Sequence, residues 1–309
     1  MCLYPKLIQN RKYQRNKKNG GNVPIPTDQR VLWVPVGCGK CMECRKQKAR
    51  GWSVRLQEEI RESKNGKFIT LTFSNESIAK LAGDIKNLDG YNLDNEIATQ
   101  AVRYFLERWR KKYKVSLRHW LVTELGHNGT ENIHLHGIIW TDEPVETVAK
   151  IWKYGYIWPR KEWKGNYVND RTVNYVAKYI MKVDQLHKEY TSKILTSPGI
   201  GRNYINRPDA KTNKFNGANT DETYRTRQGI KLNLTTYWRN QIYTEEELEK
   251  LWLQKLDKQE RWVDGMKVST ANGTDQYYQM LEEARGKNKR LGYGDFVLFN
   301  RFFSLSISS

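Results

Sequence analysis

Residues 134–140 read His-Leu-His-Gly-Ile-Ile-Trp, and this run constrains the chain more than any other. Its apolar and aromatic residues are typical of a buried or half-buried strand. Side chains two apart on a strand project from the same face, so His134 and His136 lie together while Leu135 points away. Neutral imidazole is a common ligand of divalent metals. The pattern predicts either a metal site or two polar residues on the wet face of a sheet.

Residues 170–182, DRTVNYVAKYIMK, have helical character without Gly or Pro, and Asp170 suits the N-cap of such a helix. Tyr175 and Tyr179 are four residues apart, so they share one face about 6 Å apart along the axis. Two lysines with the same spacing lie beside them: Lys178 and Lys182. Paired tyrosines are also ordinary core residues of amphipathic helices. The combination with the paired histidines is what indicates a functional site.

All four cysteines lie within the first 44 residues: Cys2, Cys38, Cys41 and Cys44. A C-x2-C-x2-C cluster in a chain with no visible secretory signal argues against a disulfide framework. The spacing indicates thiolate ligands to a structural Zn²⁺, with Cys2 as the candidate fourth ligand. An iron–sulfur cluster or a group of reduced, buried thiols would be the alternatives.

The net charge of +19 predicts a polyanionic partner, either nucleic acid or an anionic surface, bound in a salt-dependent way. No run of about 18 apolar residues exists, so we expect no membrane-spanning helix. Four basic residues are candidates for DNA contact: Lys182, Arg202, Arg108 and Arg110. The helix dipole also favours positive charge where the two last-named arginines lie, near a helix C-terminus.

Periodicity and turn signals predict an alternating order of helices and strands. The expected helices span 41–63, 96–114, 143–153, 170–182 and 244–259, and the expected strands span 67–73, 118–124, 134–140 and 154–159. With mostly antiparallel hairpin connections this order predicts an α+β fold with helices packed on one side of the sheet.

The remaining segments lack a clear pattern. Residues 1–30 read as a basic extended arm or a solvated loop, 203–230 as loop, and 285–290 as a basic run near an unstructured tail. We expect three parts: an arm with the cysteine cluster and first helix (1–63), a core (64–190) and a basic extension (191–309), mainly helix and loop.

His-hydrophobic-His followed by Tyr-x-x-Lys-Tyr resembles the HUH endonucleases of the two-tyrosine type, which initiate rolling-circle replication. Further motifs are similar to those of the replication initiators of small single-stranded DNA bacteriophages, the gokushovirus-like Microviridae. They are Cys38-Gly-Lys-Cys41-x-x-Cys44-Arg45, Phe68-Ile-Thr-Leu-Thr-Phe73, Tyr175-Val-Ala-Lys-Tyr179 and Ser197-Pro-Gly-Ile-Gly-Arg202. The resemblance covers the chain from about Cys2 to about Gly265.

The resemblance implies an RRM-like sheet with the histidines on a central strand, the tyrosine helix across from it, and a third, acidic metal ligand nearby. A two-residue turn at Asn128-Gly129 would pair Thr123 with His134, whereas a three-residue loop or a bulge would pair Glu124 with His134. We therefore expect the second register, with Glu124 as third ligand and His127 in reserve.

The resemblance also implies the chemistry: Mg²⁺ or Mn²⁺ at the histidines and Glu124 activates a phosphodiester, and a tyrosine attacks it. The product is a 5′-phosphotyrosine and a 3′-OH primer, and the strand is later rejoined into a circle. The assigned residues are the nucleophiles Tyr175 and Tyr179, with Lys178 stabilising the phosphate charge or lowering a tyrosine pKa.

The implied partners are single-stranded or supercoiled viral DNA at the replication origin, in the cytoplasm of a bacterial host. Host polymerase and helicase are expected too, because the chain has no G-x-x-x-x-G-K-[ST] motif of its own. Two other interpretations remain: a zinc-bearing DNA-binding protein without catalysis, and a transposase or plasmid relaxase of the same superfamily.

Overall fold

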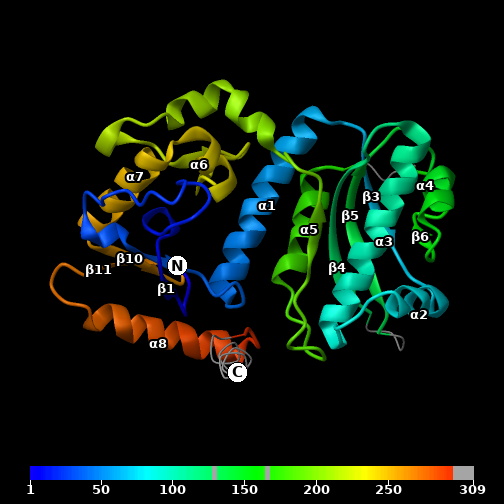
Figure 1. The fold of residues 1–309 in the computed structure, drawn as a ribbon, viewed down its shortest axis with the longest axis horizontal. Coiled ribbons are helices and arrows are strands. Elements are labelled where there is room, and N and C mark those ends of the chain that lie inside the picture. Colours follow the sequence, from blue (N-terminus) through cyan, green and yellow to red (C-terminus); the bar gives the residue numbers. More distant parts are fainter. Residues whose placement is uncertain (127–130, 164–167, 295–309) are drawn as a thin grey trace. The chain divides into compact units, whose positions relative to one another are not determined.

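The computed structural model describes residues 1–126, 131–163 and 168–294, which form two compact units (Figure 1). The terminal unit comprises 1–51, 183–189 and the chain from 205 onward. The sheet unit comprises 52–182 and 190–204. Helix α1 (Met42–Glu62) contributes residues to both. The three-part division expected from sequence stays a prediction about function, since by packing both chain ends belong to one unit.

The sheet unit is built on five strands, each antiparallel to its neighbours. In spatial order they are β6 (Ile157–Trp158), β3 (Gly66–Leu71), β5 (Ile133–Trp140), β4 (Arg118–Leu125) and β7 (Ile194–Thr196). The mixed α+β class is thereby confirmed, and the strand with the paired histidines is the central one. Strand β7 was not expected from sequence.

One face of the sheet packs against three helices: α2 (Asn75–Gly83), α3 (Gly90–Tyr113) and α4 (Val145–Trp152). Their common core includes Leu71, Leu121, Leu135, Ile139, Ala101, Phe105, Val148 and Trp152. Helix α3 begins several residues before the expected start at 96, because Asp89 takes the N-cap position. The apolar stripe predicted for this helix faces the sheet.

The second face is also covered by helices, so the expectation of helices on one side is wrong. Helix α5 (Asp170–Met181) contacts β4, and the part of α1 in this unit lies over the same face, where the rings of Trp52 and Trp120 are 5.8 Å apart. Figure 1 shows α3 and α5 on opposite sides of the strands. The reason is that Trp120 and Ile138 make this face apolar as well, and strands that are apolar on both faces need cover on both.

Helix α5 begins one residue earlier than expected. Its N-cap is Asn169, whose side chain accepts a hydrogen bond from the Thr172 backbone while the Thr172 hydroxyl completes a capping box. Asp170 instead lies in the first turn, where a negative charge favours the positive end of the helix dipole.

The terminal unit combines three two-stranded sheets with three further helices. The strand pairs are β1 (Lys6–Gln9) with β2 (Trp33–Val36), β8 (Thr223–Arg225) with β9 (Lys231–Asn233), and β10 (Glu260–Val263) with β11 (Met266–Ser269). The helices are α6 (Thr236–Ile242), α7 (Glu245–Asp257) and α8 (Asp275–Arg290).

Three segments expected to lack structure are ordered in this unit. The basic arm folds back: Tyr13 is buried, and its hydroxyl donates to Glu249 of α7 at 2.8 Å, where Lys12 also forms an ion pair. The run 285–290 is the end of α8. Residues 203–230 contain three short 3-10 helices, η3 (Arg202–Asn206), η4 (Pro208–Asn213) and η5 (Gly217–Asn219), before β8. No helix in the described ranges is long and apolar enough to cross a membrane.

The β4–β5 pairing leaves no room for a side chain at Gly137. A Cβ there would lie 2.1 Å from the Trp120 carbonyl oxygen and 2.8 Å from the Leu121 Cα, and backbone atoms cannot move without disturbing the ladder. We expect Gly137→Ala to lower the free energy of unfolding by about 2–3 kcal/mol, measured by urea denaturation. Gly83→Ala, with open space around the Cβ, is the matched control and should change stability by less than about 1 kcal/mol. Equal stabilities of the two variants would contradict the packing.

Candidate active site

Glu124 of β4 and two histidines of β5 bring their ligand atoms together on the second face of the sheet. Glu124 is paired with His134 in the ladder, as expected for the longer loop. Its Oε2 atom lies 3.2 Å from His134 Nε2 and 2.9 Å from His136 Nε2. All three ligand atoms lie within 4.8 Å of one another, so the group could hold a metal ion. His127, the reserve ligand, lies outside the described residues.

The other nitrogen of each imidazole ring is held by a second partner. His134 Nδ1 lies 3.3 Å from the Asn132 carbonyl oxygen, and His136 Nδ1 lies 3.0 Å from the Thr70 hydroxyl on β3. Such partners orient a ligating imidazole and fix its tautomer, which leaves the Nε2 lone pair for a metal. This donor set of two imidazoles and a carboxylate suits a divalent cation. Sequence reasoning missed Thr70, although it pairs directly with His136 in the β3–β5 ladder.

The carboxylate of Glu124 is held in its charged form. Burial alone would raise the pKa of Glu124, but the nearby nitrogens of His134, His136 and Lys182 outweigh it and hold the pKa well below the usual range. Burial also lowers the pKa of His136, so that its ring is neutral at physiological pH. A charged carboxylate beside a neutral imidazole is the protonation state that binds a metal cation.

The two tyrosines of α5 lie against this group. The ring of Tyr179 stacks on that of His136, with centroids 4.4 Å apart and planes 11° apart. The Tyr179 hydroxyl donates to the Tyr175 hydroxyl at 2.7 Å. Burial and then this hydrogen bond raise the pKa of Tyr179, whereas Tyr175 is 47% exposed. Both phenols therefore meet at one point beside the three candidate metal ligands, as the spacing on the helix predicts.

The two lysines of this helix have different surroundings. Lys182, at the C-cap of α5, forms an ion pair with Glu124 Oε1, the carboxylate oxygen that faces away from the imidazoles. Lys178 is exposed, and within the described ranges its ammonium group makes no hydrogen bond or ion pair. Lys182 thus orients the candidate ligand, and Lys178 is available to a bound anion. The roles assigned to them stay predictions.

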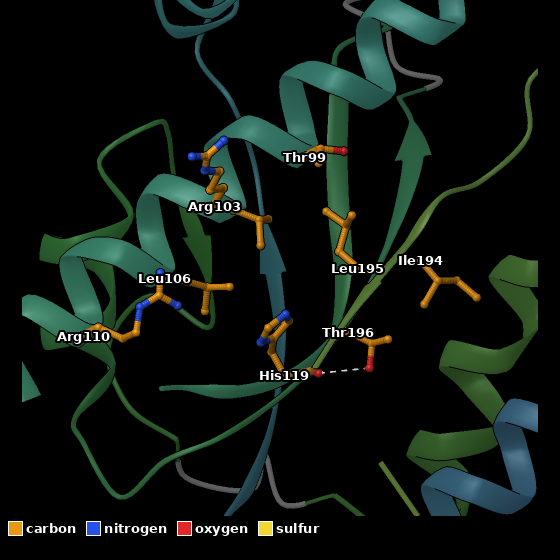
Figure 2. A pocket seen from close by; sticks show the side chains of 9 residues that line it. Thr99, Arg103, Leu106, Arg110, His119, Ile194, Leu195 and Thr196 are labelled. Atoms are coloured by element: carbon orange, nitrogen blue, oxygen red, sulfur yellow. Dashed lines mark hydrogen bonds between the residues drawn. The ribbon is translucent and has the colours of Figure 1, made fainter. Parts of the chain in front are cut away.

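The three candidate arginines are not brought to this cluster. The guanidinium of Arg108 donates to the carbonyl oxygens of Ile151 and Trp152 at 2.9 Å, where α4 ends. Arg110 lines an open pocket of about 410 Å³ between α3 and β7. Figure 2 shows that pocket with its lining residues: Thr99, Val102, Arg103, Leu106, Arg110, His119, Ile194, Leu195 and Thr196. Arg202 is exposed at the start of η3. DNA contact by these arginines stays a prediction.

The four cysteines form a second group that could hold a metal ion, and this group lies within the terminal unit. The Sγ atoms of Cys2 and Cys41 are 3.9 Å apart, and those of Cys38 and Cys44 are 4.0 Å apart. These separations exclude disulfides and are close to the edge of a tetrahedron of thiolates about 2.3 Å from a central zinc, which is about 3.8 Å.

Backbone amides surround this cluster in the manner of a thiolate site. The Cys2 sulfur accepts hydrogen bonds from the amides of Tyr4 and Cys38, at 3.3 and 3.2 Å. The Cys38 sulfur accepts one from the Cys41 amide at 3.3 Å. Leu3 and Met42 pack beside the cysteines in a small core with residues of α8 and β10, so the cluster connects the N-terminus to distant parts of the chain.

Residues 66–184 match a family of replication-associated proteins, described under the name ORF2. The matched stretch runs from β3 to just beyond α5 and contains the three candidate ligands and both tyrosines. The match supports a role as a replication initiator with DNA as the partner. No curated protein and no solved structure matches the chain.

Removing the hydroxyl that holds His136 tests whether the cluster binds metal. We expect Thr70→Val to weaken Mn²⁺ binding by about tenfold, because loss of an outer-shell partner misorients the imidazole. The measurement is titration calorimetry of Mn²⁺ into the purified protein. Thr72→Val is the matched control, since the Thr72 hydroxyl donates to the Tyr156 carbonyl oxygen and touches neither histidine. Equal affinities of the two variants and the unaltered protein would contradict the assigned contact.

Proposed function

We propose that this protein is a rolling-circle replication initiator, a metal-dependent, site-specific endonuclease that nicks single-stranded DNA and links itself to the 5′ end. The observation that carries the proposal is the meeting of two phenol hydroxyls with a Glu/His/His group at one point of the sheet. The match of the same stretch to a replication-associated family supports it.

A tyrosine oxygen attacks the scissile phosphorus in line, the bond between Oη and phosphorus forms, and the bond from phosphorus to the 3′ oxygen breaks. The phenol proton passes to water, and the departing oxygen takes up a proton to become the 3′-OH primer. A Mg²⁺ or Mn²⁺ ion held by Glu124, His134 and His136 supplies Lewis-acid stabilisation at a non-bridging phosphate oxygen. Lys178 offers a second positive charge to the same phosphate.

Two tyrosines serve a reaction that runs twice. The hydrogen bond from Tyr179 stabilises negative charge on the Tyr175 oxygen, and Tyr175 is the more exposed of the two, so Tyr175 acts first in this proposal. After one circuit of synthesis Tyr179 cuts the regenerated origin. The released 3′-OH then attacks the first phosphotyrosine, which restores Tyr175 and closes a circle. Viral DNA at its origin, host polymerase and host helicase, in the host cytoplasm, are the partners.

Tyrosine substitutions test the chemistry. We expect Tyr175→Phe and Tyr179→Phe each to retain some nicking, because the remaining phenol lies 2.7 Å from the lost one, and the double variant to retain none. The measurement is a denaturing gel of end-labelled single-stranded phage origin DNA, run with Mn²⁺ and with chelator, which detects a covalent protein–DNA adduct. Tyr278→Phe, an exposed tyrosine of the terminal unit, is the control.

Full nicking by the double variant would contradict the proposal. Tight, salt-sensitive binding without any adduct would instead favour the non-catalytic DNA-binding alternative.

We further propose that the four cysteines hold a structural Zn²⁺. Purified protein should carry about one zinc ion per chain, and Cys41→Ser should lower both the zinc content and the melting temperature, because the small core around Leu3 and Met42 is built on the cluster. Mass spectrometry of the metal content and thermal denaturation measure the two effects. Iron in place of zinc, or a melting temperature unchanged by chelator, would contradict a structural zinc.

A further inference from the structure

Two large aromatic side chains are exposed at the edge of the sheet nearest the candidate active site. Tyr156 is 73% exposed and Trp158, in edge strand β6, is 53% exposed. Ile157 between them is buried in the core of the other face, so the two rings share one face. The fold gains nothing from leaving this much apolar surface in water, and exposed aromatic groups of this kind mark binding surfaces.

The strand register places this pair on the same face as the metal-ligand group. Trp158 pairs with Thr70, and Thr70 pairs with His136, so the three lie in one row across β6, β3 and β5. Two strand spacings, about 10 Å, separate the backbone of Trp158 from that of His136. Tyr156 lies one position along, where its carbonyl oxygen accepts hydrogen bonds from the amide and hydroxyl of Thr72.

The row is continuous with the nucleophiles. The ring of Phe68 meets Trp158 edge-on, with centroids 5.7 Å apart, and meets Tyr175 edge-on at 5.6 Å. Phe68 therefore supports the indole on one side and the candidate nucleophile on the other. A ring held in this way presents its open face at little cost in conformational entropy.

Positive charge accompanies the exposed rings. The guanidinium of Arg160 lies over the Tyr156 ring, 5.1 Å from its centroid, and both Arg160 and Lys161 are exposed. Aromatic faces bordered by cations suit single-stranded nucleic acid, whose unpaired bases stack while its phosphates meet the charges. A protein partner or an apolar ligand would leave these cations without a counterpart.

We propose that Tyr156 and Trp158 form a stacking platform for unpaired bases of the DNA strand whose scissile phosphate lies at the metal-ligand group. The proposal rests on the proposed function, since it concerns the same strand at the same site. The platform positions the strand by stacking, so it contributes to binding and to placement of the phosphate without entering the chemistry.

The test is binding of a fluorescent oligothymidylate of about 12 nucleotides, followed by anisotropy in the presence of chelator so that no cleavage intervenes. Trp158→Ala should bind about 5- to 150-fold more weakly than the unaltered protein, and Trp158→Phe should retain most of the affinity because it keeps a ring to stack on. Trp262→Ala removes a 50% exposed indole from β10 in the terminal unit and is the matched control. Equal binding by the Trp158→Ala and Trp262→Ala variants would overturn the proposal.

Two further probes separate stacking from a structural effect. On a fully duplex oligonucleotide, where the bases are not available, Trp158→Ala should bind as the unaltered protein does. An equal loss on duplex and single strand would overturn stacking, and so would loss of binding by Trp158→Phe equal to that of Trp158→Ala.

The outcome is distinguishable from failure of the proposed function. If no tyrosine adduct forms on any DNA, yet Trp158→Ala selectively loses single-strand affinity, the platform stands and the nuclease proposal falls. If adducts form and Trp158→Ala binds normally, the nuclease proposal stands and the platform falls.

Discussion

The pairing of Glu124 with His134 across β4 and β5 is the constraint on which the site depends. Side chains alternate between the faces of a strand, so a slip by one residue would turn the carboxylate to the core and leave the imidazoles without it. The register is held by residues that have nothing to do with chemistry: Leu121, Leu125 and Leu135 must all face α3 for the core to close. Hydrophobic packing on one face therefore fixes the ligand geometry on the other.

Cover on the second face then determines what the cluster can do. Val173, Val176 and Ile180 of α5 are buried, and this apolar stripe aligns the helix on β4. Tyr175 and Tyr179 lie beside the stripe, so the same packing brings the phenols to His136. At the end of the helix Lys182 reaches Glu124 and opposes the cost of burying the carboxylate. The helix thus supplies both tyrosines and the charge that keeps the candidate ligand ionised.

Sequence reasoning recovered what depends on local periodicity. The alternation around His134 and His136 gave the strand, and the four-residue spacing of Tyr175 and Tyr179 gave the shared helix face. It failed where the answer depends on cross-strand neighbours or on long-range packing. Thr70 becomes a partner of His136 only once the β3–β5 register is known.

The same limit explains the errors in architecture. Trp120 and Ile138 make the second face apolar, but only the register of β4 with β5 shows that they share it. The N-terminal basic segment carries no periodic signal, and its order comes from Glu249, which is more than two hundred positions away. Contacts of that separation are not visible in any local window of the sequence.

Burial of the other tryptophans gives the exposed edge its meaning. Trp120, Trp152 and Trp238 are fully buried, so the fold has ample capacity to hide indoles. At the β6 edge it instead supports Trp158 from behind with Phe68 and leaves the outer face open. A metal-ligand group recognises only the phosphate that every nucleotide shares, so it cannot by itself distinguish paired from unpaired DNA. Rings in the same row add that distinction, since a base must leave its duplex partner and stack before it can occupy them. Strand selection and phosphate activation thereby become properties of one sheet face, set by one register.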